Sequence, residues 1–129
     1  MIKLRTHKYA GMRFTDADIS ADYDKGDFLL KDNTAGFFAN DLANGSEIAD
    51  SISQPGALFV YSADAVEVSK ASATTFATGD TVYINASDEL AKTTSSGNIQ
   101  IGTAIEAGVS GVTYVICDFD GRNRSTLGS

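Results

Sequence analysis

The chain has one cysteine, one histidine, one proline and no tryptophan among its 129 residues. A single cysteine excludes an internal disulfide and any metal site built from several cysteines. Cys117 stands in an apolar run, where a buried and unreactive thiol is expected. No apolar run approaches the roughly 18 residues of a membrane-spanning helix, so we expect no membrane partner. The basic start lacks the apolar region of a secretory signal, which predicts synthesis in a cytoplasm.

Residues that carry catalytic chemistry are equally scarce. His7, the one histidine, lies among basic residues, and no serine or cysteine nucleophile stands in a triad-like setting. Neither a Gly-x-Gly-x-x-Gly pattern nor a Walker pattern occurs, so nucleotide binding has no support. Acidic pairs such as Asp88 and Glu89 are of the type that glycoside hydrolases use, but such pairs arise by chance among 17 acidic residues. We therefore predict no enzyme and no cofactor.

One acidic segment has the ligand spacing of a calcium-binding loop. The six positions at which an EF-hand loop places its ligands are filled by Asp16, Asp18, Ser20, Asp22, Asp24 and Asp27. That loop also needs a glycine at its sixth position and a glutamate at its last, where this chain has Ala21 and Asp27. A half-buried strand over residues 15–23, with an acidic solvent face, explains the same alternation. We therefore predict a strand there and no metal site.

The net charge of −7 conceals a strong segregation. All 17 acidic residues fall between positions 16 and 120, together with four of the ten basic residues, which leaves that stretch at −13. The remaining basic residues, with a charge of +6, lie near the two ends: Lys3, Arg5, Lys8, Arg13, Arg122 and Arg124. Because contact with phosphates needs a surface rich in lysine or arginine, the acidic body predicts no nucleic-acid partner.

Short apolar segments bounded by turn residues recur along the chain, with no long amphipathic helix. Residues 28–30 and 37–38 predict a hairpin across the turn at 32–36. Further strands are predicted at residues 58–61, 66–70, 79–84, 97–104 and 111–117. Residues 46–52 fit either a short helix or a strand.

The last predicted strand has apolar side chains on both faces. Val112, Tyr114 and Ile116 share one face, and the other carries Val115, Cys117 and Phe119. This predicts a central strand that is covered on both sides. The whole pattern predicts an all-β fold, a small antiparallel β-barrel or β-sandwich with an extended N-terminal arm. We expect residues 1–13 to form that basic arm, 14–120 a single β-rich domain and 121–129 a polar C-terminal tail.

Several short motifs keep a recognisable order between residues 66 and 119. They are Val66-Glu67-Val68-x-Lys70, Gly79-Asp80-x-Val82-Tyr83, Asp88-Glu89-Leu90, Gly97-Asn98-x-x-Ile101-Gly102-x-Ala104 and Val112-x-Tyr114-Val115-x-Cys117. Their order and spacing resemble those of the tailed-bacteriophage capsid decoration, or cement, proteins. The N-terminal half fits more loosely, through Lys25-Gly26-Asp27-Phe28, Ala35-Gly36-Phe37-Phe38 and Asn44-Gly45. The long lead-in before Gly26 and its basic start depart from the family's pattern.

This resemblance implies a structural virion protein that binds the outer surface of an assembled phage capsid and stabilises it against the pressure of packaged DNA. It implies the major capsid protein as a partner and a homo-oligomer, with a trimer preferred and a dimer as the alternative. It also implies a place on the outer capsid surface of the virion, after synthesis in the host bacterial cytoplasm. A receptor- or carbohydrate-binding β module of a phage fibre has the same β-rich build and stays open as the alternative function.

The charge segregation suggests where such a protein would meet its partner. We expect the arm to order on binding and to contact an acidic capsid surface or a neighbouring subunit. The contact residues predicted on it are Lys3, Arg5, Lys8 and Arg13. The alternative is that residues 1–13 form a first strand that completes the sheet.

Overall fold

The computed structural model describes residues 1–14, 24–39 and 57–125. Those residues form nine β-strands and no helix, so none of them builds a helix that could cross a membrane. The strands are β1 (Ile2–Leu4), β2 (Tyr9–Phe14), β3 (Phe28–Lys31), β4 (Thr34–Phe38), β5 (Ala57–Ser69), β6 (Thr81–Ile84), β7 (Ala91–Lys92), β8 (Ile99–Thr103) and β9 (Tyr114–Asp120). The all-β prediction is confirmed. The strand predicted at 15–23 and the undecided segment 46–52 lie outside the described residues.

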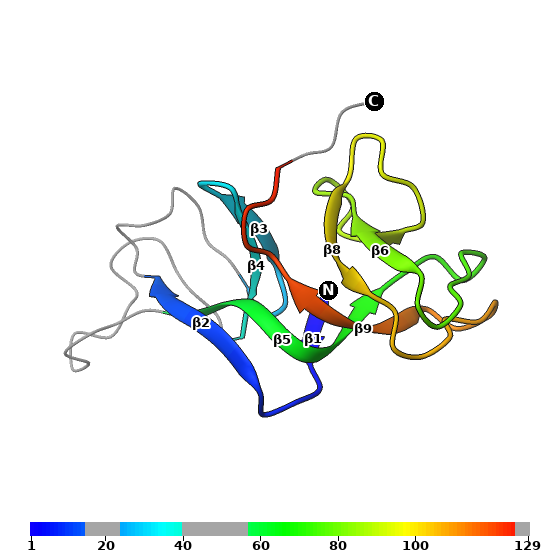
Figure 1. The fold of residues 1–129 in the computed structure, drawn as a ribbon, viewed down its shortest axis with the longest axis horizontal. Helices are drawn as coiled ribbons and strands as arrows, with labels where there is room; N and C mark the ends of the chain where they lie inside the picture. The colour runs from blue at the N-terminus through cyan, green and yellow to red at the C-terminus, as the bar shows by residue number, and fades with distance from the viewer. Residues whose placement is uncertain (15–23, 40–56, 126–129) are drawn as a thin grey trace.

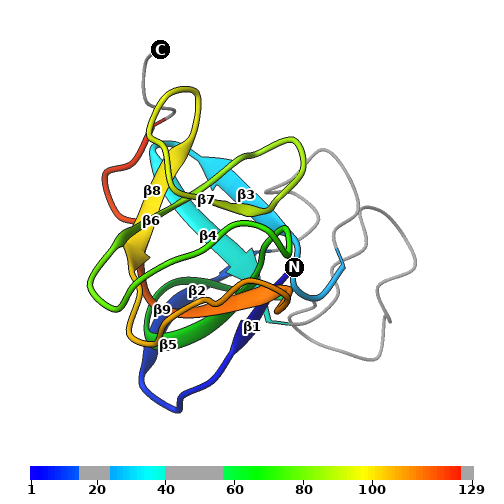
Figure 2. The same cartoon turned by 90° about the vertical axis from the view of Figure 1, so that its right-hand side faces the viewer.

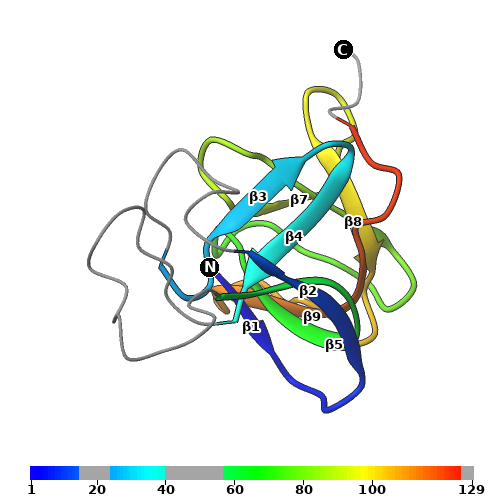
Figure 3. The ribbon, with the colours of Figure 1, turned by 90° about the vertical axis from the view of Figure 1, so that its left-hand side faces the viewer.

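β5 is the central strand of the larger of two antiparallel sheets (Figure 1). β1 and β2 pair with one edge of β5, β4 and β9 pair with the other, and β3 extends the sheet beyond β4. The backbone N–H of Ile2 donates to the carbonyl oxygen of Gly26 over 3.0 Å. The β1 edge therefore meets the turn before β3, and the sheet curls back on itself as a half-barrel (Figure 3).

The smaller sheet, in which β6 is flanked by β7 and β8, lies beside the larger one (Figure 2). Two side-chain carboxylates accept hydrogen bonds that connect the two sheets. Asp118 on β9 accepts a 2.6 Å hydrogen bond from the backbone N–H of Thr103 on β8. Glu89, between β6 and β7, accepts a 2.9 Å hydrogen bond from the backbone N–H of Phe28 on β3. The two sheets therefore hold each other in place through contacts between residues far apart in the sequence.

The hairpin predicted from residues 28–38 is confirmed as β3 and β4. Lys31 pairs with Thr34, which leaves a two-residue turn made of Asp32 and Asn33. Both turn residues have positive φ angles, 52° and 64°. Such a turn matches the right-handed twist of the flanking strands, and Asp and Asn tolerate this left-handed backbone better than most residues.

The two separate strands predicted at 58–61 and 66–70 are in fact one strand of 13 residues, β5. The register against β9 shifts between Ala63 and Val66, which marks a bulge or irregularity. A bulge bends a strand and increases its twist without ending it. The segment that separated the two predicted strands is thus a bend within β5, and the bend allows β5 to follow the curl of the sheet.

Residues 1–13 do not extend from the body as the predicted arm, because they pair with β5 along most of its length. Ile2 lies opposite Val68 and is only 2% exposed. The register shift opposite Ala10 and Gly11 places the extra residue, Tyr61, in β5. Residues 9–12 are all exposed, so β2 has no buried face there to give the sequence an apolar period. The alternative expectation, a first strand that completes the sheet, is the one that the pairing supports.

The core lies on the concave face of the larger sheet. Successive rows across β1, β5 and β9 place the buried Ile2, Val68 and Val115 side by side, then the partly buried Leu4 beside the buried Val66 and Cys117. The rings of Phe37 and Phe119 meet edge to face, with centroids 5.3 Å apart. Phe38 and Phe59 pack against each other in a separate pair, also at 5.3 Å.

The prediction for the last strand holds on one face and only partly on the other. Val115, Cys117 and Phe119 are all at most 2% exposed. On the opposite face Ile116 is 7% exposed but Tyr114 is 42% exposed, so this end of β9 is not covered. The first residues of the predicted tail are also anchored, since Gly121 donates to the carbonyl oxygen of Tyr61 over 2.7 Å.

Candidate functional site

The described residues contain no group of three or more histidine, cysteine, aspartate or glutamate side chains that could hold a metal ion. His7 is exposed in the connection between β1 and β2. Cys117 is buried, and this burial, with a smaller effect of the neighbouring Asp118 carboxylate, raises the pKa of the thiol to about 12. Because only the thiolate is an effective nucleophile, Cys117 is unreactive at neutral pH. Three surfaces of the described residues are candidates for binding.

The first candidate surface is the basic edge, defined here by Lys3, Arg5, Lys8 and Arg13. Lys3 lies on β1, Arg13 lies on β2, and the other two lie in the connection between these strands. Two backbone hydrogen bonds fix that connection against β5, from Arg5 N to Ala65 O and from Asp64 N to Lys8 O, each 3.0 Å. The structure thus brings all four predicted contact residues to one edge of the larger sheet. Lysines on an edge strand also discourage unwanted pairing with other strands, which is their ordinary structural role.

The basic residues near the C-terminus are arranged differently. The Arg122 guanidinium lies 3.1 Å from the Asp120 carboxylate. Its side-chain hydrogen bond holds the pKa of Asp120 below its usual range. Arg124 donates to the backbone carbonyl oxygen of Asp120 over 3.1 Å. These arginines anchor the end of β9, so the basic edge is the better candidate for an external contact.

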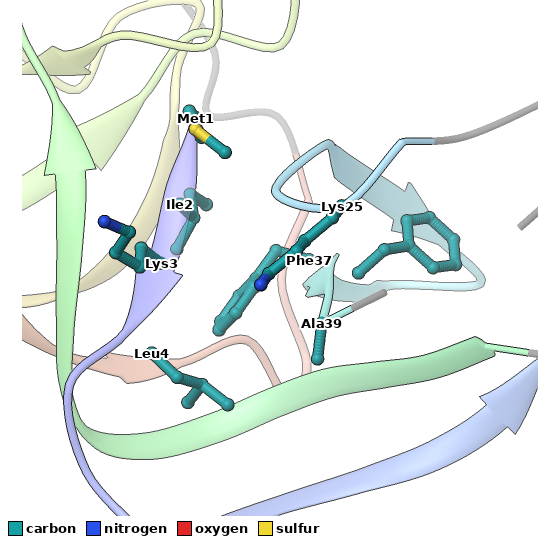
Figure 4. A pocket seen from close by; sticks show the side chains of 8 residues that line it. Met1, Ile2, Lys3, Leu4, Lys25, Phe37 and Ala39 are labelled. Atoms are coloured by element: carbon teal, nitrogen blue, oxygen red, sulfur yellow. The ribbon is translucent and has the colours of Figure 1, made fainter. Parts of the chain in front are cut away.

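The second candidate is a pocket of about 280 Å³ between β1 and the end of β4 (Figure 4). Most of its lining is apolar, with two lysines: Met1, Ile2, Lys3, Leu4, Lys25, Phe37, Phe38 and Ala39. In Figure 4 the exposed Lys25 side chain enters from the turn before β3 and points toward the side where Phe37 lies. The pocket therefore combines apolar walls with a positive charge.

The third candidate is the exposed apolar loop, defined here as residues 105–114. It presents the side chains of Ile105, Val109 and Tyr114, which are 42%, 54% and 42% exposed. Lys70, at the end of β5, is only 3% exposed, and its ammonium donates to the carbonyl oxygens of Val109 and Val112 over 3.0 and 2.6 Å. A buried lysine thus holds this loop in place.

The pocket and the buried lysine were not predicted. The pocket's lining comes from residues 1–4, 25 and 37–39, which only the curl of the sheet brings together. Lys70 did stand out as the end of a strand motif, but a lysine at a strand end is normally exposed. Its burial depends on a loop about 40 residues further along the chain, and no local pattern encodes that distance.

The described residues thus form an all-β body with a basic edge, an apolar pocket and an ordered apolar loop. The family model described as phage cement protein matches residues 11–118 of the chain. The chain therefore belongs to the phage cement protein family, which makes it a structural component of a phage capsid. Searches of the curated proteins and of the solved structures returned no match. The matched span includes Lys25 and Arg13, whereas Lys3, Arg5 and Lys8 precede it.

Proposed function

We propose that the protein binds the outer surface of an assembled phage capsid and stabilises it against the pressure of the packaged DNA. Membership in the phage cement protein family supports this role. The fold supports it as well, because β5 pairs with four other strands and distributes a local force over one cross-linked sheet. The role requires no catalysis. It places the protein on the outside of the virion, after synthesis in the host bacterial cytoplasm.

In this proposal the basic edge contacts an acidic surface of the major capsid protein. The observation that carries it is the alignment of Lys3, Arg5 and Lys8, all exposed, along one edge of a chain whose net charge is −7. One exposed ion pair contributes at most about 1 kcal/mol. A homo-oligomer, with a trimer preferred, engages several capsid sites at once, and the linked contacts then give a much higher avidity.

Co-sedimentation with capsids tests the proposal. The wild-type protein should sediment with empty expanded heads and not with unexpanded precursor shells. Because exposed charges are screened by salt, binding should weaken as the salt concentration rises. Deletion of residues 2–13 is unsuitable as a test, since it removes strands of the sheet as well as charges.

Single charge reversals are the cleaner variants. Lys8→Glu changes an exposed residue of the basic edge and should weaken head binding, with an unchanged thermal unfolding midpoint. Arg122→Glu makes the same change of charge beside Asp120, outside the basic edge, and should have a smaller effect. Equal effects of the two variants would show that only net charge matters. Absence of wild-type binding to expanded heads would refute the proposed function.

A further inference from the structure

β2 is the most exposed strand among those described. Residues 9–12 of this strand are all exposed, although side chains on a strand normally alternate between a buried and an exposed face. Gly11 is one of them, and because a glycine has no side chain, the exposed area there is backbone. Among the described strands β5 alone pairs with β2, which lies on its outer side (Figure 1). The edge of β2 that faces away from β5, called the open edge here, is therefore accessible to a partner.

A backbone hydrogen bond shows which groups of β2 line the open edge. The N–H of Asp64 on β5 donates to the carbonyl oxygen of Lys8 over 3.0 Å, so this carbonyl points toward β5. Along an antiparallel strand, the N–H and C=O groups of successive residues point alternately toward and away from the partner strand. The backbone groups of Tyr9 therefore point away from β5. The extra residue at the register shift lies in β5, so the alternation continues along β2 and places the groups of Gly11 and Arg13 on the open edge as well.

The open edge is part of the basic edge, whose charges lack acidic partners. Lys3, Arg5 and Lys8 are exposed, and no ion pair within the described ranges includes any of them. Glu67 lies opposite Lys3 in the sheet, and Asp64 lies beside Lys8, but neither carboxylate forms an ion pair with these ammonium groups. A partner that pairs with this edge is therefore favoured if it brings negative charge of its own.

The described strands of a second copy do not meet this requirement. Two open edges paired with each other bring Lys8 and Arg13 of both copies together, and like charges across an antiparallel pair are destabilising. The other edge strands that the structure describes, β3, β7 and β8, contain no aspartate or glutamate. β9 contains two aspartates, but residues 104–106 already occupy its outer side. A different protein is therefore the better occupant.

We infer that the open edge of β2 binds an extended acidic segment of the capsid protein, which adds to the larger sheet as a further strand. This rests on the proposed function and names the kind of capsid segment that the basic edge takes up. The backbone groups of Tyr9, Gly11 and Arg13 supply the hydrogen bonds of strand addition, and the basic side chains select a segment that carries carboxylates. Binding then depends on the partner's peptide N–H groups, which a contact between charged surfaces alone does not require.

Peptides of matched charge test the inference on the full-length protein. The probe is a short peptide in which glutamate and valine alternate, and the control is the same sequence N-methylated at every residue, which keeps the charges and removes the N–H donors. Isothermal titration calorimetry should show that the probe binds at least about tenfold more tightly than the control, because the control cannot form the backbone hydrogen bonds. Hydrogen exchange at the N–H groups of Tyr9 and Gly11 should slow when the probe binds. Equal affinities of the two peptides, or unchanged exchange at both groups, would overturn the inference.

Two substitutions of Tyr9 separate its backbone from its side chain. Tyr9→Pro removes the outward N–H, and proline is tolerated at the first residue of a strand. Tyr9→Ala is the matched control, because it removes the same ring and keeps the N–H. Tyr9→Pro should weaken binding of the probe several-fold more than Tyr9→Ala does, with circular dichroism as the check that both variants are folded. Equal effects of the two would contradict strand addition, and the peptide comparison on the wild-type protein stands if proline prevents folding.

Expanded heads give the same measurement with the natural partner. Exchange at Tyr9 and Gly11 should be slower in the head-bound protein than in the free protein. Head binding without this slowing would refute strand addition and leave the proposed function intact. Slowing that develops in the free protein as its concentration rises would assign the open edge to a second copy and would also refute the inference. Absence of head binding refutes the proposed function, whatever the peptides show.

Discussion

The ammonium of Lys70 donates a 2.6 Å hydrogen bond to the carbonyl oxygen of Val112 inside the protein. Lys70 is 3% exposed, and the same group also donates to the carbonyl oxygens of Val109, at 3.0 Å, and Ala71, at 3.4 Å. Backbone carbonyl dipoles therefore compensate a buried positive charge. The consequence is an apolar loop that is exposed to solvent and yet fixed to the end of β5.

Lys70→Met keeps most of the side-chain length and removes the ammonium. It should lower the free energy of unfolding by about 2–3 kcal/mol, because the carbonyl oxygens of Val109 and Val112 lose their charged donor. Urea unfolding measures this loss. Lys92→Met is the matched control, since Lys92 forms a largely exposed pair with Asp88 at 2.7 Å, and its loss should stay below about 1 kcal/mol. Equal losses in the two variants would contradict the role assigned to Lys70.

Glu89 should stabilise the junction of the two sheets as a hydrogen-bond acceptor. Glu89→Ala removes the acceptor for the Phe28 N–H and should lower the free energy of unfolding by about 1–2 kcal/mol. Glu89→Gln keeps a side-chain oxygen and should lose less than half as much. Thermal and urea unfolding give both values, with Glu106→Ala as a control at an exposed glutamate. If Gln were as damaging as Ala, the charge of Glu89 and not its oxygen would be responsible.

Cys117 should make stability fall at alkaline pH. The thiol ionises near pH 9 in the unfolded chain but has a pKa of about 12 in the folded protein. Between these values the unfolded state has fewer protons than the folded state, so stability decreases as pH rises, by up to about 1.4 kcal/mol per pH unit. Below pH 9 both states keep the proton and Cys117 contributes no slope. Cys117→Ala should lack this contribution, and the difference between the two unfolding profiles measures it.

Ile2 should contribute to stability as a core residue, contrary to the expectation of a mobile arm. Ile2→Ala removes a side chain that is 2% exposed and should cost about 2–5 kcal/mol of unfolding free energy. Met12→Ala, at a side chain that is 42% exposed, should cost far less. Urea unfolding of both variants decides the matter. An unchanged midpoint for Ile2→Ala would mean that residues 1–4 do not pair with β5 in solution.

Local patterns predicted the parts of the fold that depend on neighbours in sequence. The β3–β4 hairpin was predicted from turn residues at 32–36 with apolar residues on both sides. The turn itself is shorter, only Asp32 and Asn33, because residues 34–36 already pair within β4. Cys117 was predicted as buried because it stands within an apolar run, and it is fully buried. Both features depend on periods of a few residues, which a sequence displays directly.

The continuity of β5 and the pairing of the N-terminal strands were missed for different reasons. Residues 9–12 are exposed, so no apolar period marks β2. In β5, register shifts between Ala63 and Val66 and opposite Ala10 and Gly11 each add a residue, so its alternation of faces breaks within a continuous pairing. A break in the period is typical of a strand end, and only the partner strand shows that pairing continues. The basic residues at 3, 5, 8 and 13 were predicted as contact residues from their charge alone. The structure places them along one edge of the larger sheet.

Strand period, turn chemistry and motif order are local properties, so they already predict an all-β protein that lacks the motifs of common enzymes and resembles the cement proteins. Tertiary structure alone decided that residues 1–14 complete the sheet, that Lys70 is buried and that an apolar pocket forms beside Lys25. Each of these depends on contacts between residues far apart in the chain. Ile2 pairs with Val68, and Lys70 donates to carbonyl oxygens about 40 residues further along. The local sequence does not specify such partners.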